Sequence, residues 1–214
     1  MFRSGLKRSR PSTDGMAAPS LLSDSPGNTP IREDELASLI PDLATRAELN
    51  EWERENIISA ERWCFSPRVL KAFKPASEID LRKLHRQMFG KTWKWAGAYR
   101  KTEKNIGVPV VQINNSIAAF LGDAAYWIKD KAFEPDELAV RFHHRLVQIH
   151  PFPNGNGRHA RLLADVLAVQ LGRPRFTWGR NDLQPTGPLR EKYIAAIKTA
   201  DNGNLKPLTE FARS

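Results

Sequence analysis

The sequence predicts an all-α fold, a helical bundle in which a small β-hairpin is the only β element. Apolar residues recur at helical spacing over residues 116–130, 135–149 and 157–171, which predicts three long helices. The second and third are the most apolar and are expected at the centre of the bundle. Residues 105–113 are rich in glycine and β-branched residues and contain Pro109, a composition that favours a short edge hairpin.

Further helices complete the predicted bundle. Residues 46–63 form an amphipathic helix whose apolar stripe comprises Leu49, Trp52, Ile57, Ala60 and Trp63. Residues 77–88 form another, with Ser77 as its N-cap and with apolar contacts from Ile79, Leu81, Leu84 and Met88. A helix over residues 189–200 and a short one near Thr209 follow the central pair.

The chain divides into a tail and one domain. Residues 1–30 are rich in Ser, Pro, Gly and Arg and lack apolar periodicity, so we expect a disordered tail. Residues 31–214 form the domain, since 214 residues with 41% hydrophobic content suffice for one core. No apolar run approaches the roughly 18 residues that cross a bilayer, and the lone Cys64 cannot form an internal disulfide. These features predict a cytoplasmic protein without a membrane span.

The formal net charge of +9 favours an anionic partner. A nucleotide, a nucleic acid and an acidic protein surface all satisfy this condition. The basic residues are scattered along the chain and do not form one arm, which argues against nucleic acid. Charge alone does not choose among these partners.

A polar loop at residues 150–161, with the sequence HPFPNGNGRHAR, joins the two most apolar predicted helices. Pro151 and Pro153 stop the first helix, and the Asn-Gly-Asn-Gly run tolerates positive φ and lets backbone N–H groups point inward. The loop leads into a helix N-terminus, where unpaired N–H groups and the helix dipole favour an anion. We therefore predict a phosphate-binding loop.

Three side chains flank this loop. Arg158 and Arg161 are three residues apart at the start of the helix, so both can face the same phosphates. Cations at a helix N-terminus oppose the dipole, which is easier to explain if an anion lies between them. His150 ends the preceding helix, and the ordinary pKa of histidine suits proton transfer near neutrality. The pattern predicts a base beside bound phosphate.

The segment resembles the signature of the Fic family, His-x-Phe-x-acid-Gly-Asn-Gly-Arg-x-x-Arg. The matching residues are His150, Phe152, Gly155, Asn156, Gly157, Arg158 and Arg161. The resemblance runs from about Gly27 to Ala200 and includes Trp95 to Gly97. It is strongest to the branch called mobile mystery protein B, through the strings GNTP, TRAELNEW, FHHRLV and HPFPNGNGRHAR. It implies the Fic fold, a helical bundle with a β-hairpin flap.

The resemblance implies a protein adenylyltransferase that transfers AMP from ATP. His150 would take the proton from a Ser, Thr or Tyr hydroxyl of a target protein. That oxygen would attack the α-phosphorus of ATP, and pyrophosphate would leave. The phosphates would be bound by Gly155, Asn156, Gly157, Arg158 and Arg161, with Arg158 near the β-phosphate and Arg161 at the γ-phosphate.

The resemblance also assigns roles to the flap and to one aromatic residue. The flap would align the target segment by adding a strand beside it. Its residues are Asn105, Ile106, Gly107, Val108, Val110, Val111 and Gln112. Phe152 would anchor the loop in the core without taking part in catalysis.

Asn154 departs from the signature, which has an acid at this position. In the family this acid holds the Mg²⁺ ion that bridges the ATP phosphates. An amide oxygen can coordinate Mg²⁺ but brings no negative charge, so Asn154 is expected to be a weak ligand. Mg²⁺ can also arrive bound to ATP. The alternative is a nucleotide-binding protein with slow chemistry.

Glu55 and Asn56 match the end of an inhibitory motif of many Fic proteins, Ser/Thr-x-x-x-Glu-Gly/Asn. The match is partial because Glu51 stands at the Ser/Thr position. By this resemblance the helix at 46–63 is inhibitory, and Glu55 pairs with Arg161 and displaces the γ-phosphate. A glutamate on a charged amphipathic helix is otherwise a solvated surface residue.

Two further functions stay open at this point. A Fic-fold phosphotransferase, as in the Doc branch, would donate the γ-phosphate of its nucleotide, but the intact Gly-Asn-Gly-Arg run at 155–158 argues against it. A basic helical module would bind nucleic acid or a partner protein. Such a module predicts strong salt dependence of binding and no effect of changing His150.

Overall fold

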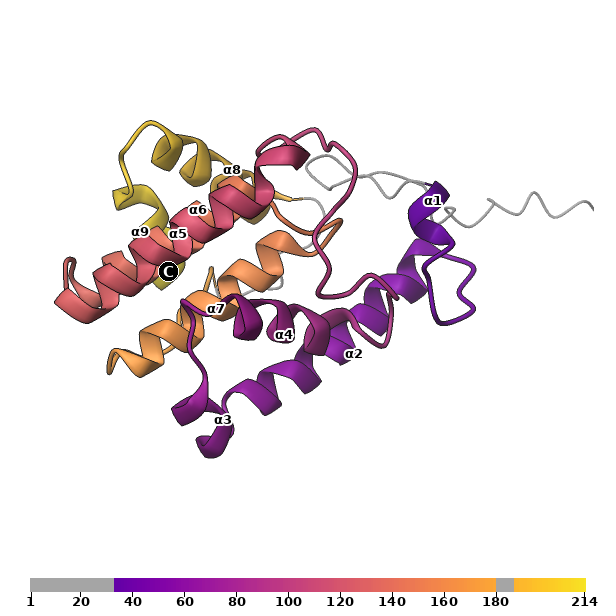
Figure 1. Ribbon diagram of the computed structural model, residues 1–214, viewed down its shortest axis with the longest axis horizontal. Helices are drawn as coiled ribbons and strands as arrows, with labels where there is room; N and C mark the ends of the chain where they lie inside the picture. Colours follow the sequence, from indigo (N-terminus) through magenta and orange to yellow (C-terminus); the bar gives the residue numbers. More distant parts are fainter. Residues whose placement is uncertain (1–32, 180–186) are drawn as a thin grey trace, which may run out of the picture.

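A computed structural model describes residues 33–179 and 187–214 (Figure 1). Its helices are α1 (Glu33–Leu36), α2 (Arg46–Cys64), α3 (Pro67–Ala72), α4 (Glu78–Phe89), α5 (Ile113–Asp130), α6 (Pro135–Ile149), α7 (Asn156–Gln170), α8 (Pro188–Asp201) and α9 (Lys206–Arg213). The described residues contain no strand, so the predicted all-α class is confirmed. None of these helices is long and apolar enough to cross a membrane. The tail predicted over residues 1–30 lies outside the described part of the chain.

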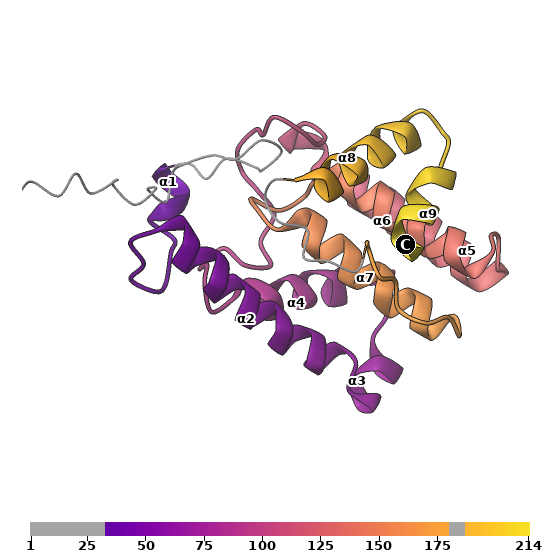
Figure 2. The ribbon, with the colours of Figure 1, turned by 180° about the vertical axis from the view of Figure 1, so that it is seen from behind.

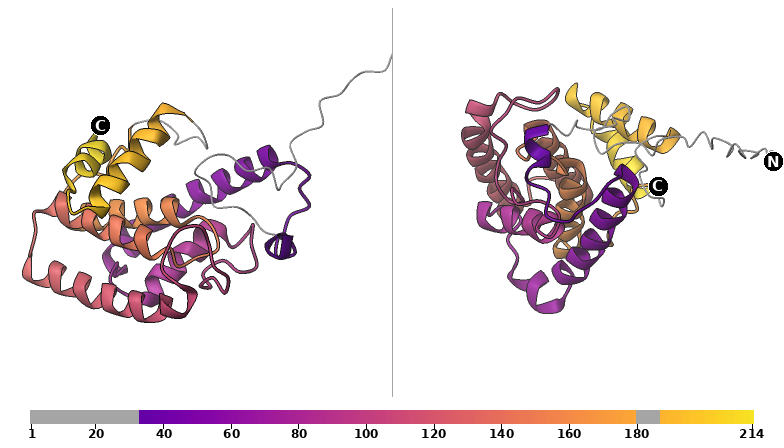
Figure 3. Two further views of the ribbon diagram at one scale, coloured as in Figure 1. Left: turned by 90° about the horizontal axis from the view of Figure 1, so that it is seen from above. Right: turned by 90° about the vertical axis from the view of Figure 1, so that its right-hand side faces the viewer.

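α6 and α7 form the centre of the bundle and share the largest contact among the described helices. α4 packs against α7, and α2 packs against α4, which builds one side of the domain (Figures 1 and 2). On the other side, α5 and α9 pack against α6, and α8 packs against α9. Seen from above, α5 and α6 lie side by side (Figure 3). α7 is therefore flanked by helices on both sides.

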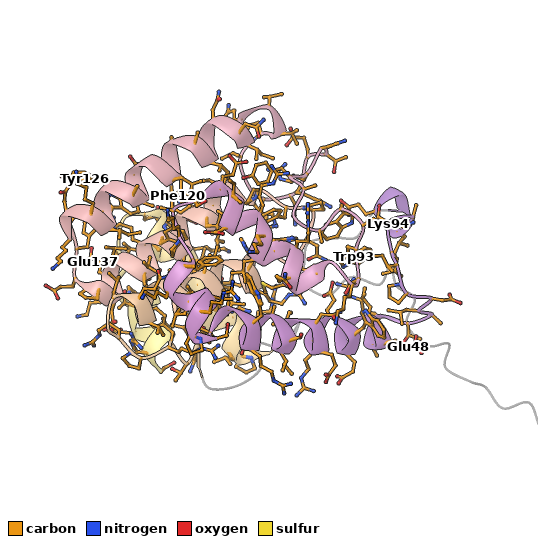
Figure 4. The ribbon with its side chains drawn as sticks, turned by 60° about the horizontal axis from the view of Figure 1, so that its bottom comes forward. Glu48, Trp93, Lys94, Phe120, Tyr126 and Glu137 are labelled. Carbon is orange, nitrogen blue, oxygen red and sulfur yellow. The ribbon has the colours of Figure 1, made fainter. Side chains whose placement is uncertain are left out.

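The apolar periodicity of the central helices matches their burial. Seven apolar residues that recur at helical spacing in α6 and α7 are each at most 1% exposed: Leu138, Phe142, Leu146, Ile149, Ala160, Leu163 and Leu167. Phe120 of α5, labelled in Figure 4, packs edge-on against Phe142, and the two ring centres are 4.7 Å apart. The core thus lies where the two most apolar helices face each other.

Side-chain caps set the starts of two helices. Thr45 Oγ1 accepts a hydrogen bond from Glu48 N, and Glu48 Oε2 accepts one from Thr45 N, which is a capping box before α2. Ser77 Oγ accepts from Asp80 N, as predicted for an N-cap of α4. α1 and α3 were not predicted, because helices this short show no apolar period.

The β-hairpin predicted over residues 105–113 does not form. The segment is an irregular loop that ends in a 3₁₀ helix, Val110–Gln112, and continues directly into α5. Val108 N donates to the Ile149 carbonyl (3.3 Å), and Val110 N donates to Glu103 Oε1 (3.0 Å). Because these backbone groups bond outside the segment, they are not available for a ladder between two strands.

α2 buries Leu49 and Ala60 of its predicted apolar stripe, but Trp52 of that stripe faces outward and two polar residues are buried. Trp52 is 43% exposed, whereas Glu53 and Asn56 are 3% and 7% exposed. Asn56 Nδ2 donates to Thr92 Oγ1 (3.1 Å), so its burial is compensated by a hydrogen bond. Ile79 of α4, also predicted to make apolar contacts, is 78% exposed. Polar contacts with residues distant in sequence therefore decide the orientation of α2.

Leu163→Ala is expected to lower the free energy of unfolding by about 2–5 kcal/mol, because Leu163 is 0% exposed and its truncation leaves a cavity. Ile79→Ala is the control, since this side chain is 78% exposed and its loss should stay within about 0.5 kcal/mol. Urea unfolding followed by circular dichroism measures both changes. Equal losses for the two variants would contradict the assigned core.

Candidate active site

The α6–α7 junction is bracketed by two residues in the left-handed conformation. His150 is the C-cap of α6, with φ 52° and ψ 58°. Gly155 is the N-cap of α7, with φ 78°. A Cβ on Gly155 would lie 2.4 Å from the ring of Phe89, so only glycine fits there. The connecting loop is short, and it keeps His150 close to the N-terminal end of α7.

Asn156 holds the shape of the loop through Phe152. Asn156 Oδ1 accepts from Phe152 N (2.9 Å), and Asn156 Nδ2 donates to the Phe152 carbonyl (2.8 Å). Phe152 is 0% exposed, in agreement with its predicted role as an anchor. Since both polar ends of the Asn156 side chain bond the backbone of Phe152, this side chain holds the shape of the loop, and the backbone N–H of Asn156 remains at the helix N-terminus.

His85 of α4 ties the loop to the segment that contains Gly97. Gly97 N donates to His85 Nδ1 (3.0 Å), and His85 Nε2 lies 3.1 Å from the Asn154 carbonyl oxygen. Because Nδ1 accepts, the proton is on Nε2, which donates to Asn154. Burial lowers the pKa of His85 well below its ordinary value, so the ring stays neutral. Sequence reasoning missed His85, which lies 69 positions from its loop partner.

Arg100, another residue that sequence reasoning missed, fixes the backbone beside His150. Its Nε donates to the His150 carbonyl (2.8 Å), and its guanidinium also donates to the Val108 carbonyl. Arg100 is 3% exposed. A Cβ on Gly107 would lie 2.7 Å from His150 Cβ, so the loop that was predicted as a flap packs directly against His150. A single loop arginine carries no periodic signal that could have identified it.

The imidazole of His150 is held in its neutral form. Its pKa is lowered from 6.5 to about 4, first by burial and then by the charge of Arg100. A hydrogen bond to the Val147 carbonyl opposes this change. A neutral imidazole at pH 7 can accept a proton, as the predicted base must.

The start of α7 already binds a carboxylate. Arg158 Nη1 lies 2.6 Å from Glu53 Oε2, and Trp93 Nε1 donates to Glu53 Oε1 at 2.7 Å. The Glu53 side chain is 4% exposed, and that of Arg158 is 33% exposed. Trp93 lies against the part of α2 that begins near Glu48 (Figure 4). α2 thus delivers a buried acid to the end of α7 where an anion is favoured.

The ion pair predicted between Glu55 and Arg161 does not form. Glu55 is exposed, because it follows Glu53 by two residues and therefore points about 200° away around the helix. Arg161 lies at Tyr193, with its guanidinium carbon 5.4 Å from the ring centre. The acid that reaches the site is Glu53, and its partner is Arg158. Glu53 lies on the helical face that also buries Leu49 and Asn56, and this spacing is the signal that could have identified it.

Gly157 leaves space on the first turn of α7. A Cβ at this position would lie 3.7 Å from both Arg161 Nη1 and Tyr193 Oη. Gly155 N donates to Asn154 Oδ1 (2.6 Å), so the first-turn N–H groups available to an anion are those of Asn156, Gly157 and Arg158. The structure therefore places Arg158 and Arg161 on the first turns of α7, with His150 at the C-cap of α6 on the other side of the short loop.

Asn154 offers a metal ion a single neutral amide oxygen. Its Oδ1 already accepts the Gly155 N–H. In the part of the chain that the structure describes, no group of three or more His, Cys, Asp or Glu residues could hold a metal ion. The donors present do not fit a resident Mg²⁺, which prefers carboxylate and water oxygens in octahedral geometry.

The profile of the Fic/DOC family matches residues 75–168. Similar curated proteins include the protein adenylyltransferase fic-1 of Caenorhabditis briggsae, which is 30% identical over 136 residues. The protein adenylyltransferase Fic of Aedes aegypti is 27% identical over 136 residues. The two alignments cover 62% of this chain but only 25% and 26% of the relatives. The chain thus spans about a quarter of the length of the curated relatives that it matches.

Solved structures share the fold. Fic-1 from C. elegans has a TM-score of 0.58 at 24% identity, covering 84% of this chain and 51% of that chain. The BepC protein from Bartonella tribocorum, solved with bound AMPPNP, has a TM-score of 0.62 at 19% identity, covering 80% of this chain and 87% of that chain. At these identities the likeness shows the architecture alone.

The His150 ring is expected to titrate with a midpoint near pH 4. Its NMR carbon signal, assigned by its loss in His150→Gln, measures this midpoint. Because the folded pKa is below the unfolded value of 6.5, the contribution of His150 to stability is complete above pH 6.5 and is lost as the pH falls toward 4. A midpoint near 6.5 would contradict the burial of this ring.

Proposed function

Because the chain carries a Fic/DOC family domain, matched over residues 75–168, we propose that it is a protein adenylyltransferase that transfers AMP from ATP to a Ser, Thr or Tyr hydroxyl of a target protein. One observation carries the proposal. A neutral imidazole, that of His150, lies beside a helix N-terminus whose Arg158 already binds the carboxylate of Glu53. Nucleotidyl transfer needs this combination of an anion site and an adjacent base. The curated relatives are named for this activity.

The groups at the site supply each proton and charge that the transfer needs. The neutral ring of His150 accepts the hydroxyl proton as the target oxygen attacks the α-phosphorus of ATP. The bond between the α-phosphorus and its bridging oxygen breaks, and pyrophosphate leaves. The phosphate oxygens accept hydrogen bonds from the first-turn N–H groups of α7 and from Arg158 and Arg161.

Bound ATP would strengthen the base. In the protein alone, burial and the charge of Arg100 hold the pKa of His150 at about 4. Phosphate groups beside the ring favour its protonated form and therefore raise this pKa. His150 thus becomes a better proton acceptor when the substrate is in place.

The loop at residues 105–112 is the proposed docking surface for the target. Val111 is 85% exposed and Ile106 is 49% exposed, so two apolar side chains face solvent in a segment that packs against His150. A target strand laid along this loop would present its hydroxyl to the base. Arg100 donates hydrogen bonds to the carbonyls of both Val108 and His150. It therefore fixes the position of the docking loop relative to the base.

Mg²⁺ is proposed to enter with ATP. Bound to the phosphates, it would neutralise part of their charge. Asn154 adds no negative charge to hold the ion, and its amide oxygen is occupied by Gly155 N. The protein itself supplies positive charge through Arg158 and Arg161.

Glu53 is proposed to keep the enzyme in a resting state. Its carboxylate occupies Arg158, which the nucleotide phosphates also need. The hydrogen bond from Trp93 fixes the other carboxylate oxygen and keeps the acid in place. ATP and Glu53 therefore compete for one cation, and α2 acts as the inhibitory helix through Glu53 in place of Glu55.

Glu53→Gln is expected to raise AMP transfer by about 10-fold or more, because glutamine keeps an acceptor for Trp93 but removes the negative charge at Arg158. Glu55→Gln is the matched control, since Glu55 is an exposed glutamate on the same helix and should leave the rate unchanged. Each protein is incubated with Mg²⁺ and ATP labelled at the α or the γ phosphorus, and covalent label on protein is counted. His150→Ala in the Glu53→Gln protein should abolish the label.

The outcomes separate the alternatives. Label from the γ position only would identify a phosphotransferase. No label from either position, despite measurable ATP binding, would contradict self-modification and favour a nucleotide-binding protein with slow chemistry. Salt-sensitive nucleic-acid binding that is indifferent to His150→Ala would favour the basic helical module. Equal gains from Glu53→Gln and Glu55→Gln would contradict the assignment of Glu53 as the inhibitory residue.

A further inference from the structure

We propose that Tyr193 of α8 is a positioning residue whose hydroxyl orients the guanidinium of Arg161 toward the terminal phosphate of ATP. Tyr193 lies beyond the matched region, residues 75–168. The inference rests on the proposed function, because it assigns a role in nucleotide binding to a residue at that site.

The contacts of Tyr193 place its hydroxyl at the first turn of α7. Tyr193 is 6% exposed, and its Oη lies 3.1 Å from His143 Nε2. The guanidinium carbon of Arg161 lies 5.4 Å from the centre of the Tyr193 ring. A Cβ built on Gly157 would lie 3.7 Å from both Tyr193 Oη and Arg161 Nη1. The hydroxyl and the guanidinium therefore meet where the helix offers its unpaired N–H groups.

A hydroxyl can orient a guanidinium without neutralising it. Arg158 is paired with the carboxylate of Glu53 at 2.6 Å, and a phosphate must displace this acid. In the part of the chain that the structure describes, no carboxylate forms an ion pair with Arg161. Its guanidinium lies beside the neutral side chain of Tyr193, so its charge is not neutralised by that partner. Arg158 is thus paired with an acid, whereas Arg161 lies beside a neutral side chain.

His143 contacts the Tyr193 hydroxyl and is itself uncharged. It is 0% exposed, and its ring lies 4.8 Å from that of Trp178. Its pKa is well below the ordinary value because of burial, with further lowering by the charges of Arg161 and His144. The connected set of His143, Tyr193 and Arg161 therefore carries a single positive charge, on Arg161.

α8 also brings a third arginine to this place. Arg190 precedes Tyr193 by three residues, so both lie on one face of α8. Burial lowers the pKa of Arg190, and the positive charges of Arg161 and Arg158 lower it further. Arg190 therefore adds to the positive charge around Arg161.

The test compares ATP with ADP, which lacks the terminal phosphate. Tyr193→Phe is made in the Glu53→Gln protein, so that the resident acid does not mask binding. This change keeps the ring that packs at 5.6 Å from Phe211 and removes only the hydroxyl. Titration calorimetry with Mg²⁺ should show ATP binding weakened about 10-fold, with ADP binding changed less than about 2-fold. Tyr126→Phe is the control, since Tyr126 is 60% exposed on α5, and it should change neither affinity.

The outcomes distinguish this inference from the function on which it rests. Unchanged ATP affinity in Tyr193→Phe, or an equal loss for ATP and ADP with a lowered unfolding midpoint, would overturn the positioning role while nucleotide binding stands. If the Glu53→Gln protein binds neither nucleotide, the proposed function and this inference both fail. Arg161→Ala should reproduce the selective loss of ATP affinity. If it does not, the assignment of Arg161 to the terminal phosphate is wrong.

Discussion

The ion pair between Glu53 and Arg158 is the contact around which the site is arranged. It joins α2 to α7 across 105 positions of sequence and places a carboxylate at the positive end of a helix dipole. Trp93 holds the second oxygen of the same carboxylate. A buried charge that loses its partner is costly, so Glu53 leaves Arg158 readily only when another anion replaces it. On the proposed function, nucleotide phosphates and Glu53 therefore compete for Arg158.

The loop itself is held by neutral groups. Asn156 bonds the backbone of Phe152, and His85, fixed in one tautomer, links Asn154 to Gly97. None of these contacts uses a charge on the loop. The loop therefore keeps the same shape whichever anion binds. The positive charges of Arg158 and Arg161 are left to interact with Glu53 or with phosphates.

Much of the fold follows from local patterns in the sequence. The apolar periods of residues 135–149 and 157–171 predict the two central helices, whose bounds differ from the prediction by at most one residue. The glycine-rich loop between them predicts the anion site, because its residue types dictate positive φ and unpaired N–H groups. These features depend on neighbours within a few residues, which a single sequence shows directly.

The rest depends on partners distant in sequence. An apolar period places Trp52 inward and Glu53 outward, yet Glu53 is buried because Trp93 and Arg158 compensate it. The same reason explains the choice of Glu55, which matches a motif but lies on the exposed side of α2. The predicted hairpin at residues 105–113 is absent because Arg100 and the end of α6 take its backbone partners. Sequence spacing cannot reveal such contacts.

The central claim is that the N-terminus of α7 is an anion site that Glu53 occupies. Titration calorimetry with inorganic triphosphate, which has neither base nor ribose, tests it most directly. The account predicts that Glu53→Gln binds triphosphate about 10-fold more tightly than the wild type, and that Arg158→Gln in the same background removes most of this gain. Equal affinities of the wild type and Glu53→Gln would contradict the claim.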